Sequence, residues 1–244
     1  MRNTTLVTLA AIGFISIVPC HAKAQTVANA LQIGLGTSFI NYSSSTLTEH
    51  RPLVTGGTND YKIDTSNTTW GFANRNGVFL EVGYGLNDMF VIGGLLQLGG
   101  TSQTVQTPAG APAGATTQTK ESMFNLFIGP KLDVMFLPDS RVRPFVGAAI
   151  GLVRFTDNIQ DTNANNVTTT PYDGGWTGVG LLGRAGIRCF LTPGFSLDPA
   201  FVFGFDTLSG STTRPVGAGT INYDTGATGY NLGLSVAASG WVGL

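Results

Sequence analysis

The chain is poor in charged residues, and it has no long apolar run. Charged side chains make up only 11% of its 244 residues, whereas an ordinary soluble domain has about a quarter. A net charge of −1 gives no basic surface for nucleic acid, so no nucleic acid is expected as a partner. The mean hydropathy is +0.18, yet no segment reaches the eighteen or so apolar residues of a membrane-spanning helix. The low charge therefore needs another explanation than a helical anchor.

The N-terminus has the three parts of a secretory signal peptide. Met1-Arg2 is charged, Leu6 to Val18 is apolar, and Ala22-Lys23-Ala24 is a small-x-small cleavage site. We expect cleavage after Ala24, so residues 1–24 are the signal peptide and residues 25–244 form one mature domain.

Cysteine is also scarce, with two residues in the whole chain. Cys20 is an alternative lipidation site, although Pro19 stands where a small residue is preferred. If Cys20 leaves with the signal peptide, Cys189 is the single mature cysteine and no intramolecular disulfide can form.

The chain does contain long alternations of apolar and other residues. From Phe124 to Phe136 every even position is apolar, while Lys131 and Asp133 occupy odd positions. Period-two alternation predicts a strand. At about 3.3 Å per residue and a tilt near 45°, this strand would span about 28 Å, close to the hydrocarbon thickness of a membrane. Lys131 and Asp133 must then face a lumen, which a closed β-barrel provides.

Seven further segments repeat the alternation, and together they predict an all-β fold, an eight-stranded antiparallel up-and-down transmembrane β-barrel. Pro130 and Pro199 lie in the middle of predicted strands on the outward face, so we expect a local bulge at each. The predicted strands are residues 31–42, 73–86, 90–98, 123–136, 143–155, 177–191, 195–205 and 229–244.

The predicted connections alternate between short and long. Short turns fit the periplasmic side of an outer-membrane barrel, and long loops fit its extracellular side. The long ones are rich in Thr, Ser, Asn and Gly, so we expect mobile loops. They are residues 43–72, 102–120, 157–176 and 207–228.

Outward-facing aromatic residues fall at two heights, as expected for two girdles at the membrane interfaces. At the short-turn end they are Tyr84, Phe90, Phe136 and Phe195, and at the long-loop end they are Phe39, Phe72, Phe124, Phe205 and Tyr230.

Three segments resemble the small eight-stranded outer-membrane barrels, the group that includes the membrane domain of outer membrane protein A and related porin-family proteins. They are Gly83-Tyr84-Gly85-Leu86-Asn87-Asp88, Phe127-Ile128-Gly129-Pro130-Lys131-Leu132 and Arg143-Pro144-Phe145-Val146-Gly147-Ala148-Ala149-Ile150-Gly151. The resemblance implies insertion into the bacterial outer membrane by the barrel assembly machinery. Members commonly end in an aromatic residue, whereas this chain ends in Leu244.

Six charged residues have inward parity and lie a few residues from the short turns. Three are acidic and three basic, so a paired network that plugs the narrow lumen is favoured over an ion gate. Arg188 with Asp198 is the first pairing expected, because their strands are neighbours, and Arg184 with Asp133 would cross the lumen. The predicted lumen network is Glu81, Lys131, Asp133, Arg184, Arg188 and Asp198.

No motif points to a catalytic, cofactor or metal site, and none is predicted. Barrel enzymes that modify lipids or cleave peptides need a general base, and the mature chain has one histidine, His50, in a predicted loop. Asp157, Asp161 and Asp173 match no defined calcium loop. Cys189 has outward parity and is expected to be an inert apolar residue.

The sequence favours a non-enzymatic outer-membrane barrel with a plugged lumen that contributes to envelope integrity and surface contact. A pore for small solutes is the alternative, and a lipid-modifying enzyme is less favoured. The expected partners are outer-membrane lipids and lipopolysaccharide, the assembly machinery, and a host or surface ligand at the loops.

Overall fold

The computed structural model describes residues 26–52, 58–70, 77–106, 116–163, 168–216 and 219–243. The predicted signal peptide, residues 1–24, lies outside these ranges. Within them, no helix is long and apolar enough to cross a membrane.

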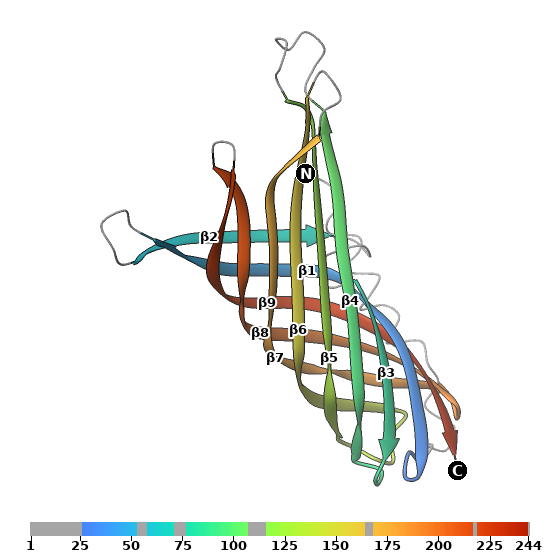
Figure 1. Ribbon diagram of the computed structural model, residues 1–244. Coiled ribbons are helices and arrows are strands. Elements are labelled where there is room, and N and C mark those ends of the chain that lie inside the picture. Colours follow the sequence, from blue (N-terminus) through green and yellow to red (C-terminus); the bar gives the residue numbers. More distant parts are fainter. Residues whose placement is uncertain are drawn as a thin grey trace.

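The described residues form nine strands in one antiparallel sheet, so the predicted all-β barrel fold is confirmed (Figure 1). Each strand from β3 to β8 pairs with the next, and β1 pairs with β9, which closes the ring. The strands are β1 Ala30–Pro52, β2 Thr58–Trp70, β3 Val78–Gly85, β4 Phe90–Gln106, β5 Thr116–Met135, β6 Val142–Asn163, β7 Thr168–Thr192, β8 Phe195–Val216 and β9 Gly219–Gly243.

The ninth strand arises because two consecutive strands, β2 and β3, share one edge of β1. β3 pairs with Leu31 to Thr37 of β1, and β2 pairs with Ile40 to Pro52 of the same strand. Because β9 pairs along nearly all of β1, both β2 and β3 lie on the opposite edge of β1. The ring therefore has the eight positions predicted from the sequence, and β2 is the strand that was not expected.

The long connections were expected to be loops, and most of their residues instead belong to paired strands. Ser43 pairs with Asn67, Ser102 with Ser122, and Asp157 with Gly174. The strands simply continue beyond the apolar alternation as two-stranded ribbons, since backbone pairing needs no apolar side chain and Thr favours strands. In Figure 1 the ribbons of β4, β5 and β6 extend upward from the barrel, whereas β1 and β2 run to the left.

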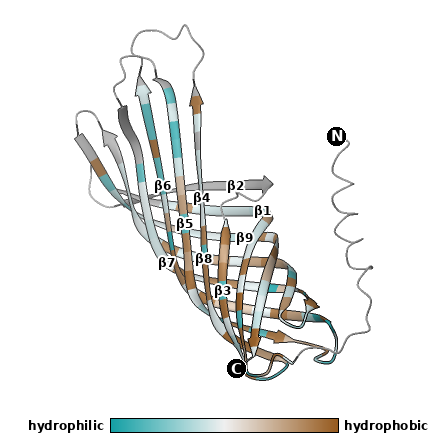
Figure 2. Cartoon of the chain, turned by 90° about the vertical axis from the view of Figure 1, so that its right-hand side faces the viewer, coloured by the Kyte–Doolittle hydropathy of each residue, from teal (hydrophilic) through white to brown (hydrophobic). Residues whose placement is uncertain are grey.

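The alternation divides the wall into an outer apolar face and a filled interior. Leu35 is 61% exposed and Phe201 70%, whereas Lys131 and Asp133 are buried. Figure 2 shows the hydrophobic colour concentrated on the half of the barrel near the C-terminus, with more hydrophilic strands beyond it. This band on the outer face is the part of the wall that meets lipid.

The bulges expected at the two mid-strand prolines are not present. Pro130 pairs with Gly94, and Pro199 with Val236, without a change of register. On the other side of each strand, the β5–β6 ladder skips Pro130 and the β7–β8 ladder skips Pro199. The register is the same on both sides of each gap. Proline is thus accommodated by a local gap in the ladder. The register shifts between Ser38 and Ile40, a pair of residues that flanks Phe39.

Candidate functional site

The structure brings all six predicted lumen charges together in one connected network. Lys131 and Asp133 lie on β5 and Glu81 on β3, and their side chains meet inside the ring. Lys131 Nζ lies 2.7 Å from Glu81 Oε2 and 3.0 Å from Asp133 Oδ2. Arg184, on β7, reaches the same two carboxylates at 2.9 Å and 3.1 Å. Two basic side chains thus bridge two acidic ones across the lumen.

Arg188, which lies on β7 like Arg184, links this network to Asp198 on β8. Arg188 Nε donates to Asp198 Oδ2 at 2.9 Å, and its Nη2 lies 3.5 Å from Asp133 Oδ2. Ser239, on β9, donates to Asp198 Oδ2 at 3.1 Å. Gln32, on β1, donates to Glu81 Oε1 at 2.9 Å and accepts from Lys131 Nζ at 3.1 Å. These contacts tie six of the nine strands to one network.

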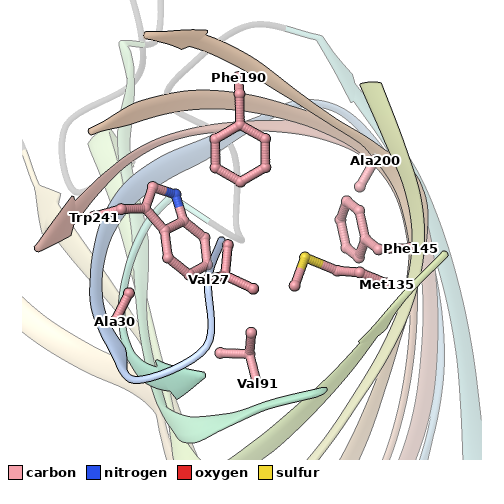
Figure 3. Packing of buried hydrophobic residues seen from close by; sticks show 8 residues of the cluster. All are labelled: Val27, Ala30, Val91, Met135, Phe145, Phe190, Ala200 and Trp241. Atoms are coloured by element: carbon pink, nitrogen blue, oxygen red, sulfur yellow. The ribbon is translucent and has the colours of Figure 1, made fainter. Parts of the chain in front are cut away.

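A cluster of apolar side chains closes the lumen between the network and the short turns. Met135 ends β5, Phe190 lies near the end of β7, and Trp241 lies near the end of β9, so all three reach the turn-side mouth. Figure 3 shows their side chains directed toward one another inside the ring. We call this the turn-side layer, and its buried members are Val27, Ala30, Val91, Met135, Phe145, Phe190, Ala200 and Trp241.

Two buried arginines pack on the rings of the turn-side layer, Arg188 of the network and Arg143 at the start of β6. The guanidinium carbon of Arg188 lies 4.9 Å from the ring centroid of Trp241 and 5.1 Å from that of Phe145. That of Arg143 lies 5.0 Å from the centroid of Phe190. Such contacts favour a desolvated cation, so the ionic and apolar parts support each other.

A second apolar cluster lies on the other side of the network, toward the long hairpins. Phe127 comes four residues before Lys131 on β5, and Leu182 comes two residues before Arg184 on β7. We call this the upper layer, and its members are Phe79, Leu95, Phe127, Ala149, Leu182, Val202 and Ala237. The network is therefore enclosed between two apolar layers, as expected for an eight-position barrel whose interior is just wide enough for side chains.

The segment before β1 folds back under the barrel mouth. Val27 is fully buried in the turn-side layer, and the chain turns at Asn29, whose φ is +60°. Asp88, in the turn between β3 and β4, accepts hydrogen bonds at Oδ1 from Thr26 Oγ1 at 2.6 Å and from Val27 N at 2.7 Å. It also accepts from Ala28 N at 3.3 Å. Gly85 allows this fold, since a β-carbon there would collide with the carbonyl oxygen of Val27.

Asp88 lies outside the membrane-spanning strands, and its hydrogen bonds affect its ionisation. Partial burial alone would raise the pKa of its carboxyl. The hydrogen bonds from Thr26, Val27 and Ala28 outweigh that effect and hold the pKa below its usual value.

The predicted girdle residues lie on the outer face at both ends of the apolar band where they are described. Tyr84 is half-buried and donates from its hydroxyl to Asn29 Oδ1 at 3.0 Å. Phe39 lies within the register shift of β1 and is half-buried. Phe72 is outside the described residues. The exposed members are Phe90, Phe124, Phe136, Phe195, Phe205 and Tyr230.

The remaining chemical candidates do not form a site among the described residues. His50 is on β1, and its side chain is not among those described. Asp157 and Asp161 share the inner face of β6, whereas Asp173 is exposed on β7. No group of three or more potential metal ligands occurs in the described part of the chain. Cys189 is half-buried near the end of β7.

Sequence reasoning missed Val27 and Asp88. Both lie outside the alternating segments, so parity gives no indication of their placement. A weak signal was present in Asn87-Asp88, because these residue types commonly bond nearby backbone groups in turns. Asn87 does so, accepting at Oδ1 from the backbone of Phe90 at 2.9 Å.

A family model described as the outer membrane protein beta-barrel domain matches residues 7–237. A search of curated proteins finds no match.

Several solved structures of outer-membrane proteins have folds similar to that of this chain. The outer membrane protease OmpT from Escherichia coli has a TM-score of 0.53 at 10% sequence identity, covering 89% of this chain and 98% of that chain. The outer membrane protein OprG from Pseudomonas aeruginosa has a TM-score of 0.46 at 12% identity, covering 86% of this chain and 96% of that chain. Ail, the attachment invasion locus protein of Yersinia pestis, has a TM-score of 0.37 at 11% identity, covering 86% of this chain and 99% of that chain. At such identities the likeness to OmpT shows the fold alone.

Proposed function

Because the chain belongs to the outer membrane protein β-barrel domain family, we propose that it is a non-enzymatic barrel, closed to solutes, that contributes to the integrity of the bacterial outer membrane. Its long hairpins would make contacts at the cell surface.

The observation that carries this proposal is the enclosed ion network. Glu81 and Arg188 have no exposed surface, and the six charges balance in sign. A water-filled pore would leave such groups hydrated. Here, Arg184 and Lys131 each contact two carboxylates, as the energetic cost of burying charge requires. An interior filled in this way supports a structural plug.

The same network supports a role in stability. It links strands that are distant in sequence, such as β1, β3 and β9 through Gln32, Glu81 and Ser239. Gln32 Nε2 donates to Glu81 Oε1 and to Ser239 Oγ, so the strands on both sides of β1 are joined inside the ring. A barrel braced in this way would resist deformation by the surrounding membrane.

We propose no enzymatic role. The protease activity in the name of OmpT belongs to that protein, and a likeness at 10% identity shows only a shared fold. The packing of the interior supports a structural role, and replacement of His50 tests the absence of catalysis.

Single-channel recording of the purified protein in a planar bilayer tests the closed lumen. We expect no large, steady conductance. Insertion is verified in the same preparation by the shift in gel mobility on boiling, so that a silent bilayer is not mistaken for a closed barrel. A large, steady conductance in the wild-type protein would instead show a pore for small solutes.

A further inference from the structure

Beyond the upper layer the interior is acidic. The described side chains with inward parity there include Glu121, Asp157, Asp161 and Asp206, and none is a lysine or arginine. Lys120 and Arg154, the nearest basic residues whose side chains are described, are exposed on the opposite face of their strands. An excess of negative charge in a narrow space raises the local concentration of cations.

Asp206 differs from the acidic residues of the lumen network, because no basic side chain lies beside it among the described residues. It lies on β8, directly opposite Gly180 of β7 and Gly229 of β9. Its Oδ1 lies 3.0 Å from the position that a β-carbon of Gly229 would take. The space at Gly180 is filled by Val153 and by the ring of Phe127. Among the described residues, the half-buried carboxylate of Asp206 has no hydrogen bond or ion pair.

Two amide side chains stand in a diagonal row with Asp206. Asn231 lies opposite Gly204 on the β8–β9 ladder, where a β-carbon at Gly204 would collide with the Asn231 amide oxygen. This makes Asn231 the diagonal neighbour of Asp206. Asn41 lies opposite Gly233 on the β1–β9 ladder, with Oδ1 3.3 Å from the place of a β-carbon there. The glycines leave room on the wall for these polar groups.

We propose that Asp206, with the amide oxygens of Asn231 and Asn41, forms a binding site for a small monovalent cation in the outer half of the lumen. A carboxylate removed from bulk water without a partner is costly, and a bound cation removes that cost. One carboxylate with neutral amides supplies a single negative charge. Ca²⁺ and Mg²⁺ usually take more carboxylate ligands or keep much of their water, so this donor set suits Na⁺ or K⁺.

The test uses ²³Na NMR of the mature protein in detergent, with NaCl as the probe. Wild-type protein is expected to broaden the sodium resonance saturably, and added KCl should compete. Asp206→Asn should weaken binding by about tenfold or more, because it removes the charged ligand. Asp173→Asn is the matched control: it removes the same charge from an exposed position on β7 and should behave as the wild type.

Folding of each variant is checked by gel mobility with and without boiling. Should Asp206→Asn not be recovered folded, Asn231→Ala replaces it, with a smaller but measurable loss of binding expected. Equal broadening in the wild type and the folded variants would overturn the proposal. So would an infrared carboxylic acid band at neutral pH that is present in the wild type and absent in Asp206→Asn, because a protonated Asp206 needs no cation.

Discussion

Arg188 and Asp198 are joined by a hydrogen bond of 2.9 Å between neighbouring strands, close to the short turn that links β7 to β8. They lie between the register pairs Gly186–Ala200 and Cys189–Leu197, so the two residues occupy facing positions on the ladder. Both side chains are almost entirely buried. Here local strand pairing is enough to bring two opposite charges together.

Truncation of either partner should therefore destabilise the barrel strongly. Arg188→Ala or Asp198→Ala leaves a buried charge without its partner, a loss of about 3–5 kcal/mol. The double variant should cost less than the sum of the two, since residues in contact are not additive. Urea-dependent unfolding in detergent micelles measures all three, with the exposed Arg154→Ala as control. Strict additivity would show that the two charges do not interact.

The inner and outer faces of the strands were predictable because side chains alternate with a period of two, and lipid selects an apolar outer face. The pairing of Arg188 with Asp198 followed from neighbouring strands. The expected pairing of Arg184 with Asp133 across the lumen is also present. The further contact of Arg184 with Glu81 was not predicted, because it depends on the stagger at which the ring closes, which no local pattern encodes.

The ribbons beyond the membrane band were not predictable for a different reason. β2 has polar residues on both faces, so it shows no apolar alternation. Its strand form depends on backbone pairing with β1, from Ile40 with Trp70 to Pro52 with Thr58. Pairing between distant polar segments leaves little trace in composition, and such segments resemble loops.

The closed ring should make the folded protein resistant to detergent at room temperature. Every strand in the apolar band is paired on both sides, apart from the short gaps at the prolines. Unfolding therefore requires many hydrogen bonds to break together. We expect the unboiled protein to migrate differently from the boiled protein on a denaturing gel. Circular dichroism should show β structure. Identical migration in several detergents, together with a helical spectrum, would contradict the fold.

Replacement of His50 tests the absence of catalysis. A lipid-modifying or peptide-cleaving barrel needs a general base, and His50 is the single histidine after the predicted cleavage site. His50→Ala should leave the lipid composition and hydrolytic activity of expressing cells unchanged from the wild type. An altered lipid A acylation pattern in the variant would favour an enzyme instead.

The contact of Asp88 with Val27 and Ala28 should depend on pH. Because its pKa is lowered in the folded protein, the ionised carboxylate stabilises the folded-back segment above the unfolded value of about 3.9. That stabilisation is lost as the pH falls through the lowered folded value. The amide protons of Val27 and Ala28, followed by NMR in micelles, should shift together, with an inflection below the usual pKa of an aspartate. Their protection from exchange, relative to the intrinsic rate at each pH, should fall at the same inflection. Asp88→Asn should abolish the inflection, whereas Asp139→Asn, in the next short turn, should preserve it. An unchanged inflection in Asp88→Asn would show that another group holds the segment.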